Sequence, residues 1–194
     1  MLDIVADLSH LHEHEIIHGD LKPASIYIAP YSERSRCLLA DYGLYKIQVH
    51  GSKLSRARKL GKVFRAPEIL EEKKWSTASD IFSLGQVMFS MAAEIVYKDE
   101  DCRYLVPMIR DGEEVHALGE ILKKDGFSQI ISAQMGKLNV LSEVVTFMLL
   151  PNPAERPEID FVKTEVGEIL EAFHARGVPE ADLQDLLARF AKAT

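Results

Sequence analysis

The fold is decided by residues 17–43, which read I-H-G-D-L-K-P-A-S-I-Y-I-A-P-Y-S-E-R-S-R-C-L-L-A-D-Y-G. Two short apolar runs, 26–29 and 37–40, are typical of β-strands, and the polar turn residues between them predict a hairpin. Asp20 precedes this hairpin and Asp41 follows it. The hairpin therefore holds two carboxylates at one edge, which suits chemistry that needs one acid near a hydroxyl and another on a metal.

Five motifs in a fixed order surround these carboxylates. The motif H-G-D-L-K-P at 18–23 resembles the catalytic-loop motif H-R-D-L-K-P, and D-Y-G at 41–43 resembles D-F-G. They are followed by A-P-E at 66–68, S-D-I-F-S-L-G at 79–85 and N-P-A-E-R-P at 152–157. Together the motifs resemble the eukaryotic protein kinase family. The resemblance implies a mainly α fold, namely the C-terminal lobe of a kinase: a helical bundle with a short β-hairpin that carries the catalytic and metal loops.

The resemblance gives five residues roles in phosphoryl transfer. Asp20 matches the residue that accepts or orients the substrate hydroxyl proton, and Lys22 matches the lysine that neutralises the transferring phosphoryl group. Asp41 matches the metal-binding aspartate. Ser25 replaces an asparagine that binds the second magnesium, and a hydroxyl is a poorer ligand than an amide oxygen, so we expect a weak metal site. Tyr27 replaces a small residue under the adenine, so we expect a poor fit for nucleotide.

Other matched positions have structural roles in the family. Asp80 is predicted to cap an apolar helix over 81–93. In the resemblance its carboxylate would accept hydrogen bonds from the catalytic loop backbone. Glu68 and Arg156 would form a buried ion pair. The full structural set is His18, Tyr42, Gly43, Glu68, Asp80 and Arg156.

Two glycines depart from the family pattern. Gly19 replaces the arginine that receives an activating phosphate in members regulated that way. Gly61 replaces a threonine whose hydroxyl would bond the catalytic aspartate and lysine. Both changes point away from a regulated, active kinase.

The nucleotide site of the family lies between two lobes, and the small lobe supplies a glycine-rich loop and a lysine. The sequence contains no G-x-G-x-x-G, and it begins about one helix before the catalytic loop. We therefore expect that the small N-terminal lobe is absent. We expect a kinase-like C-terminal lobe over 1–175 and an additional amphipathic helix within 176–194 that packs on it.

Residues 97–126 are interpreted as a less regular connection. Further helices are predicted over 2–15, 127–131, 140–150 and 159–173 from their apolar periodicity. The first of them carries three histidines. His10 and His14 have the i, i+4 spacing of a metal-binding pair, whereas His12 points to another side. Because the sequence offers no evident third ligand, we interpret these histidines as not binding a metal.

Composition indicates one globular domain: 194 residues, 47% of them hydrophobic, with a net charge of −7. Two cysteines without C-x-x-C spacing indicate neither a zinc site nor a disulfide framework. We expect no membrane span and no nucleic-acid partner, and an intracellular, cytoplasmic location. Residues 44–67 contain seven basic residues and no acidic one, which fits either a solvated loop or a site for a phosphate or an acidic partner.

Two functions remain open. The first is a pseudokinase-like lobe without enzymatic activity or cofactor, which acts as a protein-interaction, scaffold or regulatory subunit. Its protein partner would bind the face near Tyr27 and Tyr42, which the small lobe covers in a complete kinase. The alternative is a fragment of an active or weakly active Ser/Thr protein kinase that uses ATP and magnesium, with its small lobe upstream or on another chain. The retained Asp20, Lys22 and Asp41 favour the alternative.

Overall fold

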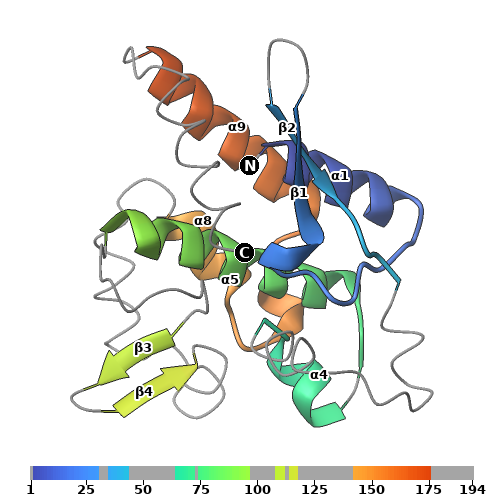
Figure 1. Cartoon of the computed structure of the whole chain (residues 1–194). Coiled ribbons are helices and arrows are strands. Elements are labelled where there is room, and N and C mark those ends of the chain that lie inside the picture. Colours follow the sequence, from blue (N-terminus) through green and yellow to red (C-terminus); the bar gives the residue numbers. More distant parts are fainter. Residues whose placement is uncertain are drawn as a thin grey trace.

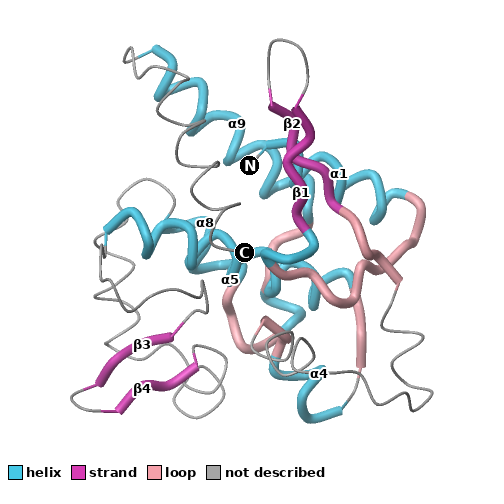
Figure 2. Tube along the Cα trace, viewed as in Figure 1, coloured by secondary structure: helices cyan, strands magenta, loops and turns pink. Residues whose placement is uncertain are grey.

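The computed structural model describes residues 2–30, 35–43, 64–72, 74–96, 108–111, 114–117 and 142–175. Within these ranges the chain is mainly helical and contains two separate two-stranded antiparallel sheets (Figures 1 and 2). The prediction of a mainly α fold with a short hairpin is thereby confirmed. The predicted helices over 127–131 and 176–194, and the whole of the basic stretch from 44 to 63 with Gly61, lie outside the described residues.

The first helix, α1 (Leu2–Glu13), packs alongside α9 (Ile159–Ala175), although the two are far apart in the sequence (Figure 1). Its buried positions Ile4, Val5 and Leu8 follow the spacing of one helix face. Burial of this stripe fixes the direction from which the chain enters the catalytic loop. The helix ends two residues earlier than predicted.

The predicted hairpin is present as β1 (Ile26–Pro30) and β2 (Ser35–Leu39). Residues that alternate along a strand point to opposite faces. Ile26 and Cys37 are buried on the inner face, whereas the directly paired Tyr27 and Leu38 are both exposed on the other. The hairpin therefore has a packed face and an open apolar face.

Two aspartates of α1 attach the hairpin to the helix. The Asp3 carboxylate accepts the backbone N–H of Cys37 at 3.1 Å, and the Asp7 carboxylate accepts that of Leu39 at 3.0 Å. These bonds supply acceptors along the β2 edge, where β1 does not pair. The catalytic loop, which leads into β1, and the metal loop, which follows β2, are thus joined by a hairpin that is bonded to α1.

The remaining helices build the centre of the lobe. They are α4 (Pro67–Glu72), α5 (Thr77–Val96) and α8 (Ser142–Met148), with 3-10 turns η1 (Pro23–Ser25) and η2 (Pro153–Glu155) in the connections. All residues of α5 from 79 to 90 are buried. At Gly85 a Cβ atom would lie 2.9 Å from Cβ of Met148, so only glycine permits α5 to approach α8 this closely.

Two predictions about local structure were wrong. Helix α5 begins at Thr77, so Asp80 lies in its first turn and does not cap it. Ser76 is the residue that caps, because its hydroxyl accepts the backbone N–H of Ser79 at 3.3 Å. The hairpin of β3 (Met108–Asp111) and β4 (Glu114–Ala117) lies in a stretch interpreted as an irregular connection, since four-residue strands give too short a pattern to detect.

None of the helices in the described ranges combines the length and the apolar character needed to cross a lipid bilayer.

Candidate active site

The catalytic loop is held in place by one buried carboxylate. Asp80 is 1% exposed, and its two oxygens accept the backbone N–H groups of His18 and Gly19, each at 2.8 Å. The His12 ring lies 3.0 Å from the same carboxylate and donates its Nε2–H, because an ionised carboxylate can only accept. Asp80 therefore ties the end of α1 and the catalytic loop to the start of α5.

Gly19 adopts a backbone conformation that suits glycine. Its φ is +77°, in the left-handed region, and its carbonyl accepts the indole N–H of Trp75 at 3.2 Å. The Trp75 contact has no counterpart in the sequence motifs. The turn at this position is thus specified by backbone geometry as well as by Asp80.

His18 joins the catalytic loop to the metal loop. Its Nε2 donates to the carbonyl of Ala40 at 2.9 Å, and its own carbonyl accepts the N–H of Gly43 at 2.9 Å. Its Nδ1 accepts the N–H of Asp20 at 3.3 Å, so the ring is the neutral Nε2–H tautomer. Burial lowers the pKa of His18, although the nearby Asp80 carboxylate and the Ala40 carbonyl act in the opposite direction. A neutral ring therefore connects the two loops.

Asp20 lies between two cations. Lys22 forms an ion pair with Oδ2, and the Arg65 guanidinium is 3.8 Å from Oδ1. The Asp20 side chain is 6% exposed, whereas that of Lys22 is 21% exposed and so remains open to solvent. Arg65 was not identified from the sequence, where it is only the residue before A-P-E. A hydroxyl that reaches Asp20 would find a proton acceptor beside two positive charges.

Ser25 faces the interior of the loop. It is fully buried, and its hydroxyl donates to the carbonyl of Asp20 at 3.1 Å. Its backbone N–H donates to the Lys22 carbonyl and its carbonyl accepts the N–H of Ala40, both at 2.9 Å. The residue predicted as a weak metal ligand is thus engaged in holding the two loops together.

Asp41 is exposed at the start of the metal loop and has a φ of +63°, a conformation that aspartate adopts more readily than most residues. The next residue, Tyr42, is 55% exposed, and Gly43 completes the turn with a φ of +74°. Tyr27 is 52% exposed on the open face of the hairpin. Its exposed cross-strand partner Leu38 was not identified from the sequence. Tyr42 thus exposes an aromatic ring next to Asp41 in the chain, and Tyr27 exposes another on the hairpin.

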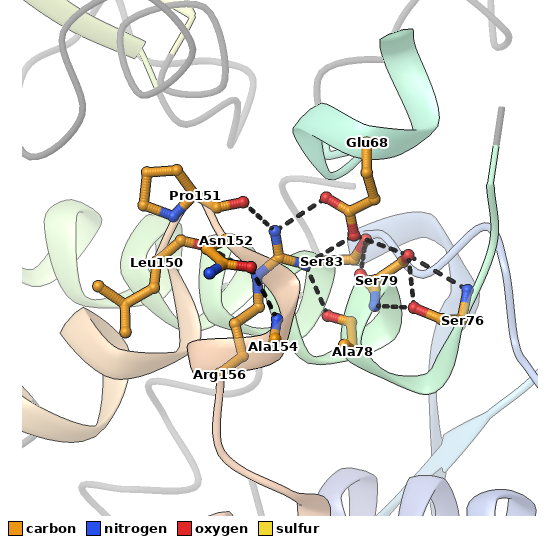
Figure 3. Close-up of polar contacts among 10 residues, drawn as sticks. All are labelled: Glu68, Ser76, Ala78, Ser79, Ser83, Leu150, Pro151, Asn152, Ala154 and Arg156. Carbon is orange, nitrogen blue, oxygen red and sulfur yellow. Dashed lines mark hydrogen bonds and ion pairs between the residues drawn. The ribbon is translucent and has the colours of Figure 1, made fainter. Parts of the chain in front are cut away.

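The ion pair between Glu68 and Arg156 anchors A-P-E to the lower helices (Figure 3). The guanidinium binds both Glu68 oxygens, at 2.7 and 2.8 Å, in the two-pronged geometry that makes arginine–carboxylate pairs strong. It also donates to the carbonyls of Leu150, Ala78 and Pro151 at 2.7, 2.9 and 2.9 Å, respectively. Every direction in which this buried cation can donate is therefore occupied by an acceptor.

Glu68, the other partner of the ion pair, has a further hydrogen bond. Glu68 also accepts the hydroxyl of Ser79 at 2.8 Å. Burial alone would raise the pKa of Glu68, but the hydrogen bonds and the charge of Arg156 outweigh it, so the pKa of Glu68 lies below its ordinary value. The ion pair is thus fully charged at neutral pH.

Comparison with known proteins agrees with the motifs. The family model described as "Protein kinase domain" matches residues 1–183. The chain is 32% identical over 157 residues to a membrane-associated tyrosine- and threonine-specific cdc2-inhibitory kinase of Drosophila melanogaster. The matched region covers 81% of the chain and 26% of that protein. It is 27% identical over 201 residues to an L-type lectin-domain containing receptor kinase S.1 of Arabidopsis thaliana, covering 97% of the chain and 29% of that protein. The chain thus spans less than a third of the length of these relatives.

Proposed function

The chain belongs to the protein kinase family, and from this premise we propose that it is a pseudokinase-like lobe that acts as a protein-interaction or regulatory module. In this proposal it carries out no measurable phosphotransfer by itself.

The orientation of Ser25 is the observation that carries the proposal. In protein kinases the magnesium ions are held by the metal-loop aspartate and the catalytic-loop asparagine, together with the phosphates of the substrate. The hydroxyl of Ser25 is buried and committed to the Asp20 carbonyl, and Asp20 itself is occupied by Lys22. Among the described residues of the two loops, Asp41 is thus the exposed carboxylate that remains for a metal. A single ligand of this kind would hold magnesium and a triphosphate weakly.

The second candidate is a lobe of an active Ser/Thr kinase whose small lobe is supplied from elsewhere. The contact that favours it is the ion pair between Asp20 and Lys22, which keeps the proton acceptor and the phosphoryl-neutralising cation side by side. In that case magnesium would bind at Asp41, and ATP would be the phosphoryl donor.

A phosphotransfer assay separates the two candidates. We expect the chain, supplied with magnesium, ATP and a generic Ser/Thr protein substrate, to transfer phosphate within about twofold of the background given by its Asp20→Asn and Asp41→Asn variants. A ligand at 100 times its Kd stabilises by about 2.7 kcal/mol, which for a chain of this size raises Tm by roughly 5–10 °C. We expect magnesium and ATP to raise Tm by less than about 1 °C.

The variant Ser25→Asn provides a gain-of-function comparison, since it restores the family's amide ligand. A magnesium-dependent rise in Tm that is larger in Ser25→Asn than in the wild type would support the weakened metal site. Phosphate transfer by the wild type that both aspartate variants abolish would contradict the proposal and favour the second candidate.

The open face of the hairpin is the proposed docking surface for a protein partner. Tyr27, Leu38 and Tyr42 are 52%, 38% and 55% exposed, and the first two are direct cross-strand neighbours. Exposed apolar groups that adjoin one another are typical of interaction sites. Aromatic side chains are enriched in the centres of protein interfaces, which favours a protein partner over a small molecule.

Site-specific photo-crosslinking tests this surface in the cells that make the protein. We expect a photoreactive residue at position 27 to give a discrete crosslinked product. The control position is Phe161 of α9, which is 46% exposed and lies on another element. The same product from both positions, or no product from position 27, would contradict the docking surface.

A further inference from the structure

Three exposed side chains at the C-terminal end of α1 form a compact cluster of metal ligands. His10, Glu13 and His14 each offer a ligand atom, and these atoms lie within 4.8 Å of one another. The two imidazole rings have centroids 4.4 Å apart, and His10 Nδ1 lies 4.0 Å from Glu13 Oε2. From this geometry we propose that the cluster is a surface site for a divalent transition-metal ion, with zinc as the best-matched ion.

The spacing of the cluster is that of one helix face. Residues i, i+3 and i+4 are neighbours on a helix surface, so all three side chains project from the same side of the last turn. His12 is on another side of the helix, where its ring is 7% exposed and pairs with Asp80. The site and the support of the catalytic loop therefore use different faces of α1.

The His14 ring has the tautomer that a ligand requires. Its Nδ1 lies 2.8 Å from the carbonyl oxygen of His10. A carbonyl can only accept, so Nδ1 carries the proton and Nε2 keeps its lone pair. Histidines that bind metals usually donate their other ring N–H to a carbonyl or carboxylate, which fixes the ring orientation. His14 already has this arrangement in the absence of a metal.

The Glu13 carboxylate is also oriented. Its Oε1 lies 3.2 Å from the hydroxyl of Ser9, a residue that is 1% exposed. The same hydroxyl lies 3.2 Å from Oδ1 of Asp160, so the two carboxylates share its one proton. Its other oxygen, Oε2, is the one that faces His10. The spacing of the histidines in the sequence offers no evident third ligand, and in the structure Glu13 supplies it.

The donor set selects the ion. Two imidazoles and one carboxylate, with water in the fourth position, are ligands typical of tetrahedral zinc sites. Ligand bonds of about 2.0–2.2 Å place the donors of such a site roughly 3.3–3.5 Å apart, so the exposed side chains must close by about 1 Å. Calcium and magnesium prefer oxygen donors, of which the cluster offers a single carboxylate.

Calorimetric titration of the chelator-treated chain with zinc chloride tests the site. We expect one zinc ion to bind per chain, with an association constant that falls at least about tenfold in His10→Ala and in His14→Ala. Loss of a residue that only hydrogen-bonds a metal ligand typically lowers metal affinity about 10–100-fold. Loss of a direct ligand should therefore lower it at least as much. Glu13→Gln keeps an oxygen for Ser9 but removes the charge, and we expect it to weaken binding as well.

Two controls locate the effect. Asp41→Asn, in the metal loop, and Glu171→Gln, an exposed carboxylate on α9, should bind zinc as the wild type does. The Tm of each variant, measured with excess chelator, should match that of the wild type, which shows that loss of binding is not loss of folding. Zinc affinity that is unchanged when both His10 and His14 are replaced, or is lost in Asp41→Asn, would overturn the proposal.

Discussion

Replacement of Arg156 by alanine should lower the free energy of unfolding by about 3–5 kcal/mol, because it leaves the Glu68 carboxylate buried without its counter-charge. The side chain of Arg156 has no exposed surface and donates to Glu68 and to three backbone carbonyls. Its guanidinium also lies 4.8 Å from the ring centroid of Phe82. Urea unfolding, followed by circular dichroism, measures the change.

Glu68→Ala is expected to cost less than Arg156→Ala. In that variant the cation still donates to the carbonyls of Leu150, Ala78 and Pro151. Arg156→Ala instead leaves those three acceptors without this donor and leaves Glu68 with the Ser79 hydroxyl alone. The matched control is Glu72→Ala on the same helix α4. Glu72 is exposed, so its removal should change stability by no more than about 0.5 kcal/mol. Equal effects of Arg156→Ala and Glu72→Ala would contradict the role of the ion pair.

The pH dependence of the free energy of unfolding provides a second test of the ion pair between Glu68 and Arg156. The pKa of Glu68 is lower in the folded chain than in the unfolded one, so its contribution is fully present above the ordinary value of about 4.3. The contribution is lost as the pH falls from there through the folded pKa. Glu68→Gln should remove this part of the acid unfolding. If the stability of Glu68→Gln falls with decreasing pH as steeply as that of the wild type, protonation of Glu68 does not contribute to acid unfolding.

Replacement of Asp80 by asparagine should destabilise the chain by about 3 kcal/mol, although the two side chains have nearly the same shape. The amide offers one acceptor oxygen, so its NH₂ group must face a donor, either the N–H of Gly19 or those of His18 and His12. An unsatisfied buried donor costs about 1–3 kcal/mol, and more where the lost partner was charged. We therefore expect a large effect from a change of one atom.

Hydrogen exchange shows whether the loss arises in the catalytic loop. The amides of His18 and Gly19 should lose protection in Asp80→Asn more than those of the α5 interior. Asp160→Asn is the matched control, because Asp160 also lies in the first turn of a helix but is exposed. Retention of protection at His18 and Gly19 would contradict the proposed support.

Motif order in the sequence predicted the long-range contacts of this lobe better than its local structure. The pairing of Glu68 with Arg156 and the contact of Asp80 with the catalytic loop join residues far apart in the chain, which no periodicity could connect. The resemblance to a family whose motifs occur in the same order made them predictable. Helices α1 and α9 were found from their apolar spacing, because each buries one stripe.

The features that were missed depend on packing or on single bonds. The start of α5 was placed too late, because Thr77 and Ser79 are polar and the cap is made by Ser76. Arg65 approaches Asp20 through a turn that the sequence pattern does not describe. Glu13 became visible as a ligand beside His10 only when the side-chain positions were known.

The bonds that position the catalytic loop come from its backbone and from the ring of His18. Asp80 accepts hydrogen bonds from the amides of His18 and Gly19, and the His18 ring donates to the Ala40 carbonyl. None of these bonds uses the side chain of Asp20 or of Lys22. Substitution of Asp20 or Lys22 would therefore leave these bonds in place. A lineage can lose turnover by substituting either residue and still inherit an intact shape, which is how a former catalyst can be recruited as a binding surface.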